Sequence, residues 1–270
     1  MNNRLVAIVQ MHSIRDKHEN LSKSVDFIDE AAAKGADFVC FPEFQMAFSP
    51  ASQPARQLVS IAENIKGNFI AVLSKVAKKN RIGVIATMYE KSTNPRRVYD
   101  TAVILSPAGD VMSVYRKLHL YDALGFKESM KLEPGKKMIM PAKTKVGNIG
   151  LMICYDLRFP EMSRLLTIKG ADLLVVPSGW VQGEMKEVHW ETMVKARAIE
   201  NGSYVVAPAQ VGNIYCGRSM AVDPFGTVLV DMGQREGVEI VEIDYLRLKK
   251  IRQSLPLLKN RRTDIYNLSA

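Results

Sequence analysis

Long apolar runs are missing from this sequence of 270 residues. No uninterrupted apolar segment approaches the roughly 18 residues that a membrane-spanning helix needs. The N-terminal segment MNNRLVAIVQM is too short for a signal peptide and lacks a small-residue cleavage site. These absences predict a cytoplasmic protein without a membrane partner. Because 47% of the residues are apolar, the chain can still bury a full core.

Cysteine is scarce as well. The three cysteines, at positions 40, 154 and 216, are far apart and never form a C-x-x-C pair, so neither a disulfide framework nor a zinc ribbon is predicted. The H-E-x-x-H and G-x-G-x-x-G motifs are also absent. We therefore expect neither a metal nor an organic cofactor, and each thiol has to be judged by its own position.

Clustered positive charge is missing too, although the formal net charge is +9. Lysines and arginines are spread over several segments, as in KVAKKNR and LKNRRTD, without aromatic residues between them. The sequence contains no recognisable nucleic-acid-binding motif. This pattern favours a solvated basic surface over a nucleic-acid partner.

Strand-like and helix-like segments alternate along the chain, and no low-complexity segment, Gly/Ser linker or change in composition interrupts them. This organisation predicts a single α/β domain. Residues 4–11 and 36–43 have the apolar composition of buried strands. Between them the sequence predicts a helix over residues 20–34, ended by Gly35, whose apolar stripe consists of Leu21, Val25, Ile28 and Ala32.

Three short phrases of the first half recur in the second half in the same order. KGADFVCFPE (34–43) is echoed by KGADLLVVPS (169–178), NRIGVIAT (80–87) by NGSYVVAP (201–208), and ILSPAGDV (104–111) by AVDPFGTV (221–228). A helix, a glycine and a strand are a common α/β pattern, but three recurrences in one order favour an internal duplication. The duplication predicts two similar sheets, each with helices on one face. We expect them to pack as a four-layer α-β-β-α sandwich with pseudo-twofold symmetry.

The segment GLMICYDLRFPE (150–161) passes from an apolar strand through a cysteine into charged residues. Reactive groups in open α/β sheets collect beyond the carboxyl ends of strands, and both Glu43 and Cys154 follow such a strand. At a strand-to-helix elbow, the first N–H groups of the helix would lower the pKa of the Cys154 thiol below about 8.5 and bind an oxyanion. A cysteine at a strand end is also an ordinary core residue. We favour that interpretation for Cys40 and Cys216.

A thiol nucleophile needs a proton acceptor. The four histidines, at positions 12, 18, 119 and 189, are not excluded, but none belongs to a recognised Cys-His protease pattern. Glu43 is the better-placed base because it lies at a strand end.

Three blocks of the sequence resemble the catalytic blocks of the nitrilase (carbon-nitrogen hydrolase) superfamily: FPE at Glu43, YRKLHLYD around Lys117, and GLMICYDLRFPE around Cys154. The resemblance spans nearly the whole chain, through HWETMVKARAIENGSYVV, GRSMAVDPFGTV and RRTDIY. The block CYDLRFPE is most similar to the Nit-type amidases, which include omega-amidases and deaminated-glutathione amidases. True nitrilases usually have Trp-Glu where Tyr155 and Asp156 stand here. The resemblance implies one carbon-nitrogen hydrolase domain over residues 1–270.

By this resemblance, Cys154 is the nucleophile, Glu43 the general base and Lys117 the cation that stabilises the tetrahedral intermediate. A second glutamate is also expected. Glu128, in GFKESMKLEPG, resembles it most closely, and Glu133 is the alternative.

The same resemblance suggests how the substrate would be held. The backbone N–H of Tyr155 would bind the oxyanion with the lysine, and Phe48 and Trp180 would form the pocket walls. Asp156 and Arg158 could clamp a substrate carboxylate. We expect them instead to tie the turn to neighbouring helices.

The implied reaction is hydrolysis of a small linear amide to a carboxylate and ammonia through a cysteine thioester. N-carbamoyl amide hydrolysis, nitrile hydrolysis, a non-catalytic scaffold and a redox-sensing thiol are the alternatives. Family members form dimers, so we expect a homodimer or higher homo-oligomer in which residues 245–270 contact the partner subunit.

Overall fold

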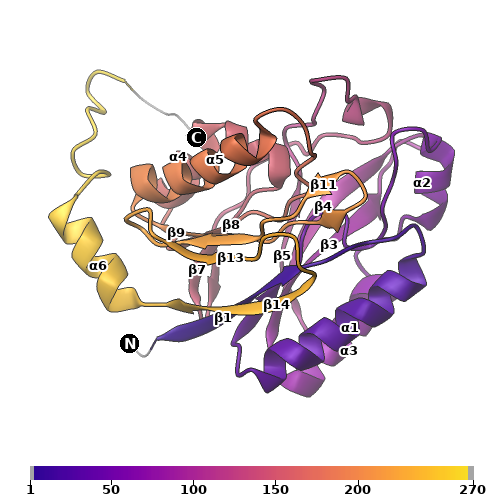
Figure 1. Cartoon of the computed structure of the whole chain (residues 1–270), viewed down its shortest axis with the longest axis horizontal. Helices are drawn as coiled ribbons and strands as arrows, with labels where there is room; N and C mark the ends of the chain where they lie inside the picture. The colour runs from indigo at the N-terminus through magenta and orange to yellow at the C-terminus, as the bar shows by residue number, and fades with distance from the viewer. Residues whose placement is uncertain (1–2, 267–270) are drawn as a thin grey trace.

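The apolar segments of the sequence form strands at the centre of the computed structural model, which describes residues 3–266 (Figure 1). In this part of the chain the strands make two six-stranded sheets and a two-stranded ribbon. The first sheet has the order β14 (Gly237–Ile243), β1 (Arg4–Gln10), β2 (Phe38–Cys40), β3 (Gly83–Lys91), β4 (Val98–Leu105) and β5 (Val111–Arg116). The second has the order β13 (Val228–Asp231), β12 (Met220–Val222), β9 (Tyr204–Ala207), β8 (Leu173–Val175), β7 (Gly147–Leu151) and β6 (Ala142–Thr144). The ribbon pairs β10 (Val211–Gly212) with β11 (Tyr215–Cys216).

The two sheets share one internal topology, as the repeated phrases predict. β1, β2 and β3 are parallel, and so are β7, β8 and β9. Each parallel trio continues into two antiparallel strands, β4 and β5 in the first sheet and β12 and β13 in the second. Each of these hairpins also contains one irregularity of register. The strand order confirms the internal duplication.

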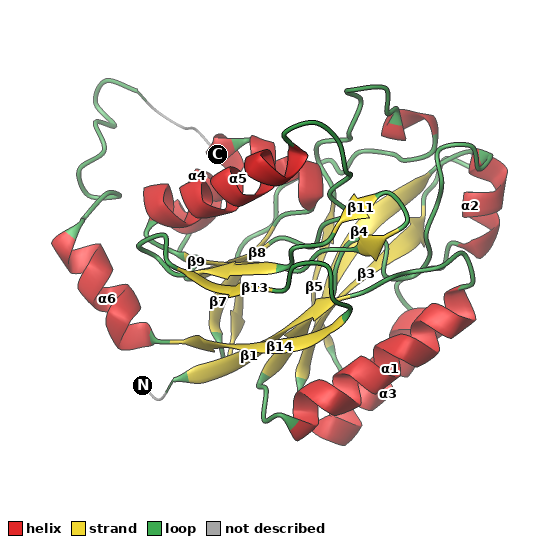
Figure 2. Cartoon of the chain, in the orientation of Figure 1, coloured by secondary structure: helices red, strands yellow, loops and turns green. Residues whose placement is uncertain are grey.

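Helices cover the outer face of each sheet (Figure 2). The first sheet carries α1 (Lys17–Ala33) and α3 (Asn68–Asn80), and α2 (Ala55–Ile61) contacts β3; the second sheet carries α4 (Pro160–Ile168) and α5 (Lys186–Asn201). Along β1, Val6 and Ile8 belong to the core between the sheets, whereas Ala7 and Val9 pack under the helices, because strand side chains alternate between faces. This arrangement is the predicted four-layer sandwich. No helix within residues 3–266 is both long and apolar enough to cross a membrane.

The first helix begins three residues earlier than the sequence analysis predicted. Asp16 caps α1 by accepting hydrogen bonds from the backbone N–H groups of His18 and Glu19, so the helix starts at Lys17. Its buried face is also rotated from the predicted stripe, and contains Asn20, Leu21, Ser24, Ile28 and Ala31. The predicted end is correct, since Gly35 adopts a φ of +81° just after the helix.

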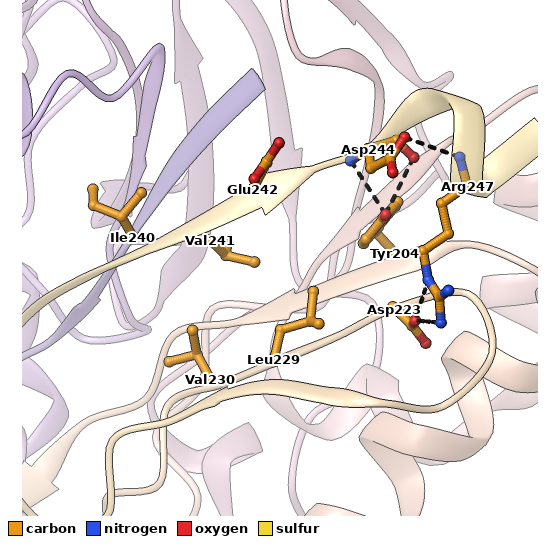
Figure 3. A pocket seen from close by; sticks show the side chains of 9 residues that line it. All are labelled: Tyr204, Asp223, Leu229, Val230, Ile240, Val241, Glu242, Asp244 and Arg247. Atoms are coloured by element: carbon orange, nitrogen blue, oxygen red, sulfur yellow. Dashed lines mark hydrogen bonds and ion pairs between the residues drawn. The ribbon is translucent and has the colours of Figure 1, made fainter. Parts of the chain in front are cut away.

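The end of the chain returns to the first sheet as β14 and continues into α6 (Tyr245–Ser254). A pocket of about 260 Å³ lies between this segment and the second sheet (Figure 3). Its polar groups bond to one another: Arg247 pairs with Asp223, and the Tyr204 hydroxyl bonds to the backbone of Asp244. We therefore assign this pocket to the packing of the chain end. Of the segment 245–270 expected to contact a partner, residues 267–270 lie outside the described residues.

Candidate active site

Three side chains singled out by the sequence meet at one edge of the two sheets. Glu43 follows β2, Lys117 follows β5, and Cys154 follows β7 as the first residue of the short 3₁₀ helix η2 (Cys154–Arg158). All three are buried, with exposed fractions of 0%, 1% and 8%. Strand ends on two separate sheets therefore bring a base, a cation and a thiol into one water-poor place.

Lys117 is the centre of the hydrogen-bond network. Its Nζ donates to Glu43 Oε1 at 2.6 Å and lies 2.9 Å from Glu128 Oε2. Glu43 Oε2 accepts from the backbone N–H of Gly179, and Glu128 Oε2 from that of Tyr121, both at 2.7 Å. These bonds hold two carboxylates on either side of one ammonium group. Glu128 follows the loop after β5 and opens the 3₁₀ helix η1 (Glu128–Met130).

The turn that carries Cys154 is held in an unusual conformation. Cys154 has a φ of +42°, in the left-handed region that a side chain disfavours. The buried Asp156 stabilises this turn: its Oδ2 accepts from the Tyr115 hydroxyl at 2.6 Å and from Ile153 N at 2.8 Å. Its Oδ1 accepts from His119 N at 3.1 Å and lies 2.7 Å from His119 Nδ1. The carboxylate thus fixes the direction in which the sulfur points.

Cys154 and Glu128 line a cavity of about 430 Å³. Aromatic side chains form much of its wall, namely Phe44, Tyr89, Tyr121, Phe126 and Tyr215. Lys127 and Lys131 also line it. An amide held in this cavity would meet the Cys154 thiol and the Glu128 carboxylate, and the Lys117 ammonium group lies directly behind that carboxylate. A thiol, a carboxylate and an ammonium group are what acyl transfer requires.

Comparison with known proteins agrees with this chemistry. The family model described as carbon-nitrogen hydrolase matches residues 5–253. The chain belongs to the carbon-nitrogen hydrolase family.

Three relatives illustrate the likeness. The chain is 36% identical to the nitrilase and fragile histidine triad fusion protein NitFhit of Drosophila melanogaster over 98% of its own length, but spans only 59% of that protein. It is 34% identical to the deaminated glutathione amidase of Escherichia coli O157:H7, covering 93% of both chains. Its structure matches that of Nit3 from Saccharomyces cerevisiae, a member of branch 10 of the nitrilase superfamily, with a TM-score of 0.86 at 30% identity, covering 96% of this chain and 97% of that one.

In this carbon-nitrogen hydrolase the pKa of the Cys154 thiol is raised well above its usual range. Burial is the main cause and the charge of Glu43 adds to it, whereas Lys117 opposes the shift. The sequence analysis predicted a lowered pKa, and that prediction was wrong. η2 is a short 3₁₀ turn, the α-helix begins only at Pro160, and the sulfur is almost sealed from water. The raised pKa favours the neutral thiol, so a base would have to remove its proton before the sulfur could act as a nucleophile.

The charged ammonium form of Lys117 is nevertheless favoured. Burial favours the neutral amine, but the charges of Glu128 and Glu43 outweigh it and raise the pKa of Lys117 well above its ordinary value. Burial also raises the pKa of Glu128, against the opposing effect of Lys117. The hydrolase thus keeps a positive charge beside the sulfur.

Asp100 is a third carboxyl group near the lysine, and the sequence analysis missed it. Its Oδ2 lies 3.8 Å from Lys117 Nζ and has no hydrogen-bond partner among the described residues. Burial, followed by the charge of Glu43, raises the pKa of Asp100 well above its usual range. A signal was present in the sequence, because an aspartate inside the apolar strand RVYDTAVIL is unusual unless it is paired or functional.

The aromatic residues that the sequence analysis placed at the pocket differ in their position relative to the cavity. Tyr155 follows the sulfur in the turn. Phe48 meets the Tyr215 ring edge-on with ring centres 5.9 Å apart, and Trp180 is 3% exposed and packs against Trp190. Within the described chain neither Phe48 nor Trp180 lines the cavity; Phe44 and Tyr215 stand there instead. Trp180 is turned into the protein interior, whereas Phe48 is half-buried and supports the cavity wall through its contact with Tyr215.

The four histidines all lie in the described part of the chain, and none lines the cavity. His119 bonds to Asp156 and stacks on Phe159, with ring centres 3.6 Å apart, so it supports the turn rather than the sulfur. Arg158 lies over the Trp180 ring at 4.7 Å. Asp156 therefore holds the turn, but it does so through β5 and the residues after it and not through the neighbouring helices that were predicted. Arg158 packs on an aromatic ring and does not pair with Asp156.

The remaining candidates are separated from the cavity. Glu133, the alternative to Glu128, accepts a hydrogen bond from Ser92. Cys40 and Cys216 are buried in the core between the sheets, where burial raises the pKa of both thiols, that of Cys216 to about 12. Both have the environment of core residues.

Proposed function

We propose that this carbon-nitrogen hydrolase is an amidase that converts a small linear amide to a carboxylate and ammonia, with Cys154 as nucleophile. One observation carries the proposal: the Lys117 ammonium group lies between the Glu43 and Glu128 carboxylates, beside the only thiol that lines the described cavity. The relatives named deaminated glutathione amidase support amides, rather than nitriles, as the substrate class.

In the first half of the reaction, Glu43 takes the proton of the Cys154 thiol as the sulfur attacks the amide carbon. The carbonyl oxygen becomes an oxyanion, which Lys117 and the backbone N–H of Tyr155 stabilise. That N–H lies in the first turn of η2, where no carbonyl of the same helix can accept from it. The tetrahedral intermediate then breaks its C–N bond, and Glu43 returns its proton to the departing ammonia.

In the second half, a water molecule attacks the thioester. Glu43 accepts one proton of this water, and a second oxyanion forms beside Lys117. The C–S bond then breaks, Glu43 returns its proton to the Cys154 sulfur, and the acid product leaves as the carboxylate after losing its remaining proton to water. Glu128 keeps Lys117 in place throughout, since it is anchored to the backbone of Tyr121. Both halves use side chains of this chain, the backbone N–H of Tyr155 and water.

The test is an ammonia-release screen with the purified full chain. The substrates tested are α-keto-acid amides, deaminated glutathione, short aliphatic amides, carbamoyl amino acids and nitriles. With each substrate, the mass of the intact protein is also measured by mass spectrometry. We expect turnover of amides and a transient acyl adduct on Cys154. Cys154→Ala should abolish turnover and remain folded, and the matched control Cys216→Ala should keep its activity. Retained ammonia release by Cys154→Ala would overturn the proposal. Release of carbon dioxide together with ammonia from carbamoyl amino acids would instead identify the protein as a carbamoyl amidohydrolase.

We further propose that the protein works in the cytoplasm as a homodimer that joins through α4 and α5, with residues 245–270 beside the interface. Apolar side chains on these helices support this surface: Ile168 is 39% exposed, Val188 51% and Ile199 44%. Exposed apolar residues on neighbouring helices are typical of a subunit interface.

A further inference from the structure

Asp100 is a buried carboxyl group on β4, and the strand register sets its surroundings. It pairs with Tyr89 of β3, and its carbonyl accepts from the backbone N–H of Lys117 at 2.9 Å. Because strand side chains alternate between faces, these three side chains share one face, and Tyr89 lines the cavity. The neighbouring cation Arg116 lies on the opposite face, where it pairs with Glu90 at 2.6 Å. Asp100, which is 2% exposed, is therefore cut off from water and from that cation.

The Asp100 carboxyl group has few donors that would stabilise a negative charge. Its Oδ2 has no hydrogen-bond partner among the described residues and lies 3.8 Å from Lys117 Nζ, which is beyond hydrogen-bond length. Lys117 bonds instead to Glu43 and Glu128. Asp156 provides the contrast, because it is similarly buried but accepts from a tyrosine hydroxyl and two backbone N–H groups. Buried carboxylates normally receive such donors, so the surroundings of Asp100 suit a neutral acid.

A proton on Oδ2 would turn this acceptor into a donor, and Glu43 is the neighbour that can accept from it. Burial, the charge of Glu43 and a side-chain hydrogen bond with Glu43 raise the pKa of Asp100, whereas Lys117 opposes the shift. Of the other titratable groups that face Asp100, Glu128 adds to the shift, and Tyr89 is a neutral phenol because burial raises its pKa. Each Glu43 oxygen already accepts one hydrogen bond and has a second lone pair for another.

We propose that Asp100 is a positioning residue that remains protonated and donates a hydrogen bond to Glu43, so that Glu43 stays ionised as the base for Cys154. This inference rests on the proposed amidase function and adds a residue to its mechanism. A hydrogen bond donated to a carboxylate favours the charged form, whereas an ionised Asp100 would repel that charge and leave the proton on Glu43. A protonated Glu43 could not take the proton of the thiol. Asp100 does not line the described cavity, so it acts through Glu43.

Infrared difference spectroscopy of the full chain near neutral pH tests the proton directly. The spectrum of the original protein minus that of Asp100→Asn should contain the C=O band of a neutral carboxylic acid, which lies above the amide I band. A heavy carbon isotope in the aspartate carboxyl groups should shift this band, which separates Asp100 from Glu128. The matched control Asp26→Asn, at an exposed position of α1, should give only bands of an ionised carboxylate. If Asp100→Asn gave only those bands, the inference would be overturned whether or not any amide is hydrolysed.

The pH dependence of kcat/KM tests the effect on Glu43, because only its carboxylate form accepts the thiol proton and its ionisation sets the acid limb. The substrate is the amide with the highest turnover in the ammonia-release screen. Asp100→Leu should move the acid limb to higher pH by about one unit, since Glu43 loses a donor to its charged form. Below the limb, kcat/KM should therefore fall about 10-fold. Asp100→Asn keeps an N–H donor, so its limb should stay within about 0.3 unit of the original while kcat/KM falls less than in the leucine variant.

Two kinetic outcomes would overturn the inference. A shift of the acid limb of Asp100→Asn to lower pH would show that the replaced group was an ionised carboxylate that repelled the charge of Glu43. A loss of rate in both variants without movement of the limb would show that Asp100 serves packing alone. If Asp100→Leu does not fold, Asp100→Asn and the infrared spectrum still decide. Absence of turnover with every amide, combined with the neutral-acid band of Asp100, would remove the amidase proposal and keep the proton on this residue.

Discussion

Lys117 lies among three carboxyl groups, those of Glu43, Glu128 and Asp100, at distances of 2.6, 2.9 and 3.8 Å. One positive charge cannot compensate three negative charges in a place from which water is excluded. The conflict is visible in the pKa of two of the carboxyl groups: burial raises the pKa of both Asp100 and Glu128, and the charge of Glu43 adds to each shift. Burial is likewise the main cause that raises the pKa of the Cys154 thiol, and the negative charge of Glu43 adds to it.

Asp100→Asn tests this distribution of charge. Because the pKa of Asp100 is raised in the folded state, its contribution to stability is present below its unfolded pKa of about 3.9 and is lost as pH rises through the folded value. Asparagine cannot ionise, so it avoids this loss. We expect the variant to gain roughly 1–3 kcal/mol over the original protein between about pH 4 and pH 8.

Thermal unfolding measured across that pH range checks this expectation. Asp26→Asn, at an exposed position of α1, is the matched control and should show no such trend. A stability difference for Asp100→Asn that is constant from pH 4 to pH 8 would show that the buried carboxyl group is not the source.

At the scale of single elements, the turn η2 decides the geometry of the site. Its five residues convert the end of β7 into the start of α4, and the positive φ of Cys154 turns the sulfur toward Glu43 and Lys117. The strain of that conformation is balanced by Asp156, whose carboxylate accepts hydrogen bonds from Tyr115 and His119 at the end of the β5 segment and from Ile153, just before the turn. The Cys154 thiol is therefore positioned by a residue that does not line the cavity.

Asp156→Asn should damage the turn despite its nearly identical shape. The Tyr115 hydroxyl, Ile153 N and His119 N all donate to this carboxylate, so an amide NH₂ would face at least one donor instead of an acceptor. We expect a stability loss of roughly 1–3 kcal/mol. Misplacement of the sulfur should lower kcat/KM by about 10- to 100-fold.

Chemical denaturation and steady-state kinetics measure the two effects. Tyr115→Phe removes one donor to the carboxylate, and with it the acceptor of Leu118 N, but keeps the bonds from Ile153 N and His119 N to Asp156, so it should lose less of both. If Asp156→Asn were as active as the original protein, the turn would not depend on this carboxylate for its shape.

At the scale of the whole molecule, the duplicated halves build one site between them. Glu43 and Lys117 come from the first sheet, and Cys154 from the second. The hydrogen bond from Gly179 N to Glu43 crosses from one half to the other. Neither half holds all three of these groups alone, because they meet only where the strand ends of the two sheets share an edge.

The proposed dimer is testable at this scale. Val188→Glu places a charge on α5 in the centre of the proposed interface, where its desolvation would oppose association. We expect this variant to elute as a monomer in size-exclusion chromatography with light scattering, while the original protein elutes as a dimer. Val111→Glu, on an exposed strand of the first sheet, should remain a dimer. If Val188→Glu still eluted as a dimer, the interface would have to lie elsewhere on the molecule.

Much of the fold could be predicted from the sequence, because the spacing of apolar residues indicates which positions are buried. The apolar runs predicted strands buried on both faces, and the recurring phrases predicted two sheets of one topology. The blocks around Glu43, Lys117 and Cys154 pointed to residues that the structure brings together. The end of α1 was also predictable, because a glycine with positive φ is a local requirement.

Only the tertiary structure decided the rest, because distance through space and exclusion of water are properties of the packed molecule. Asp100 meets Lys117 across neighbouring strands, and Lys131 faces a loop some eighty residues earlier in the chain. The same holds for the raised pKa of Cys154, which depends on how completely the sulfur is sealed and on how many carboxylates surround it. The order of residues determines which elements form, whereas the charge balance of the site emerges only when those elements exclude water together.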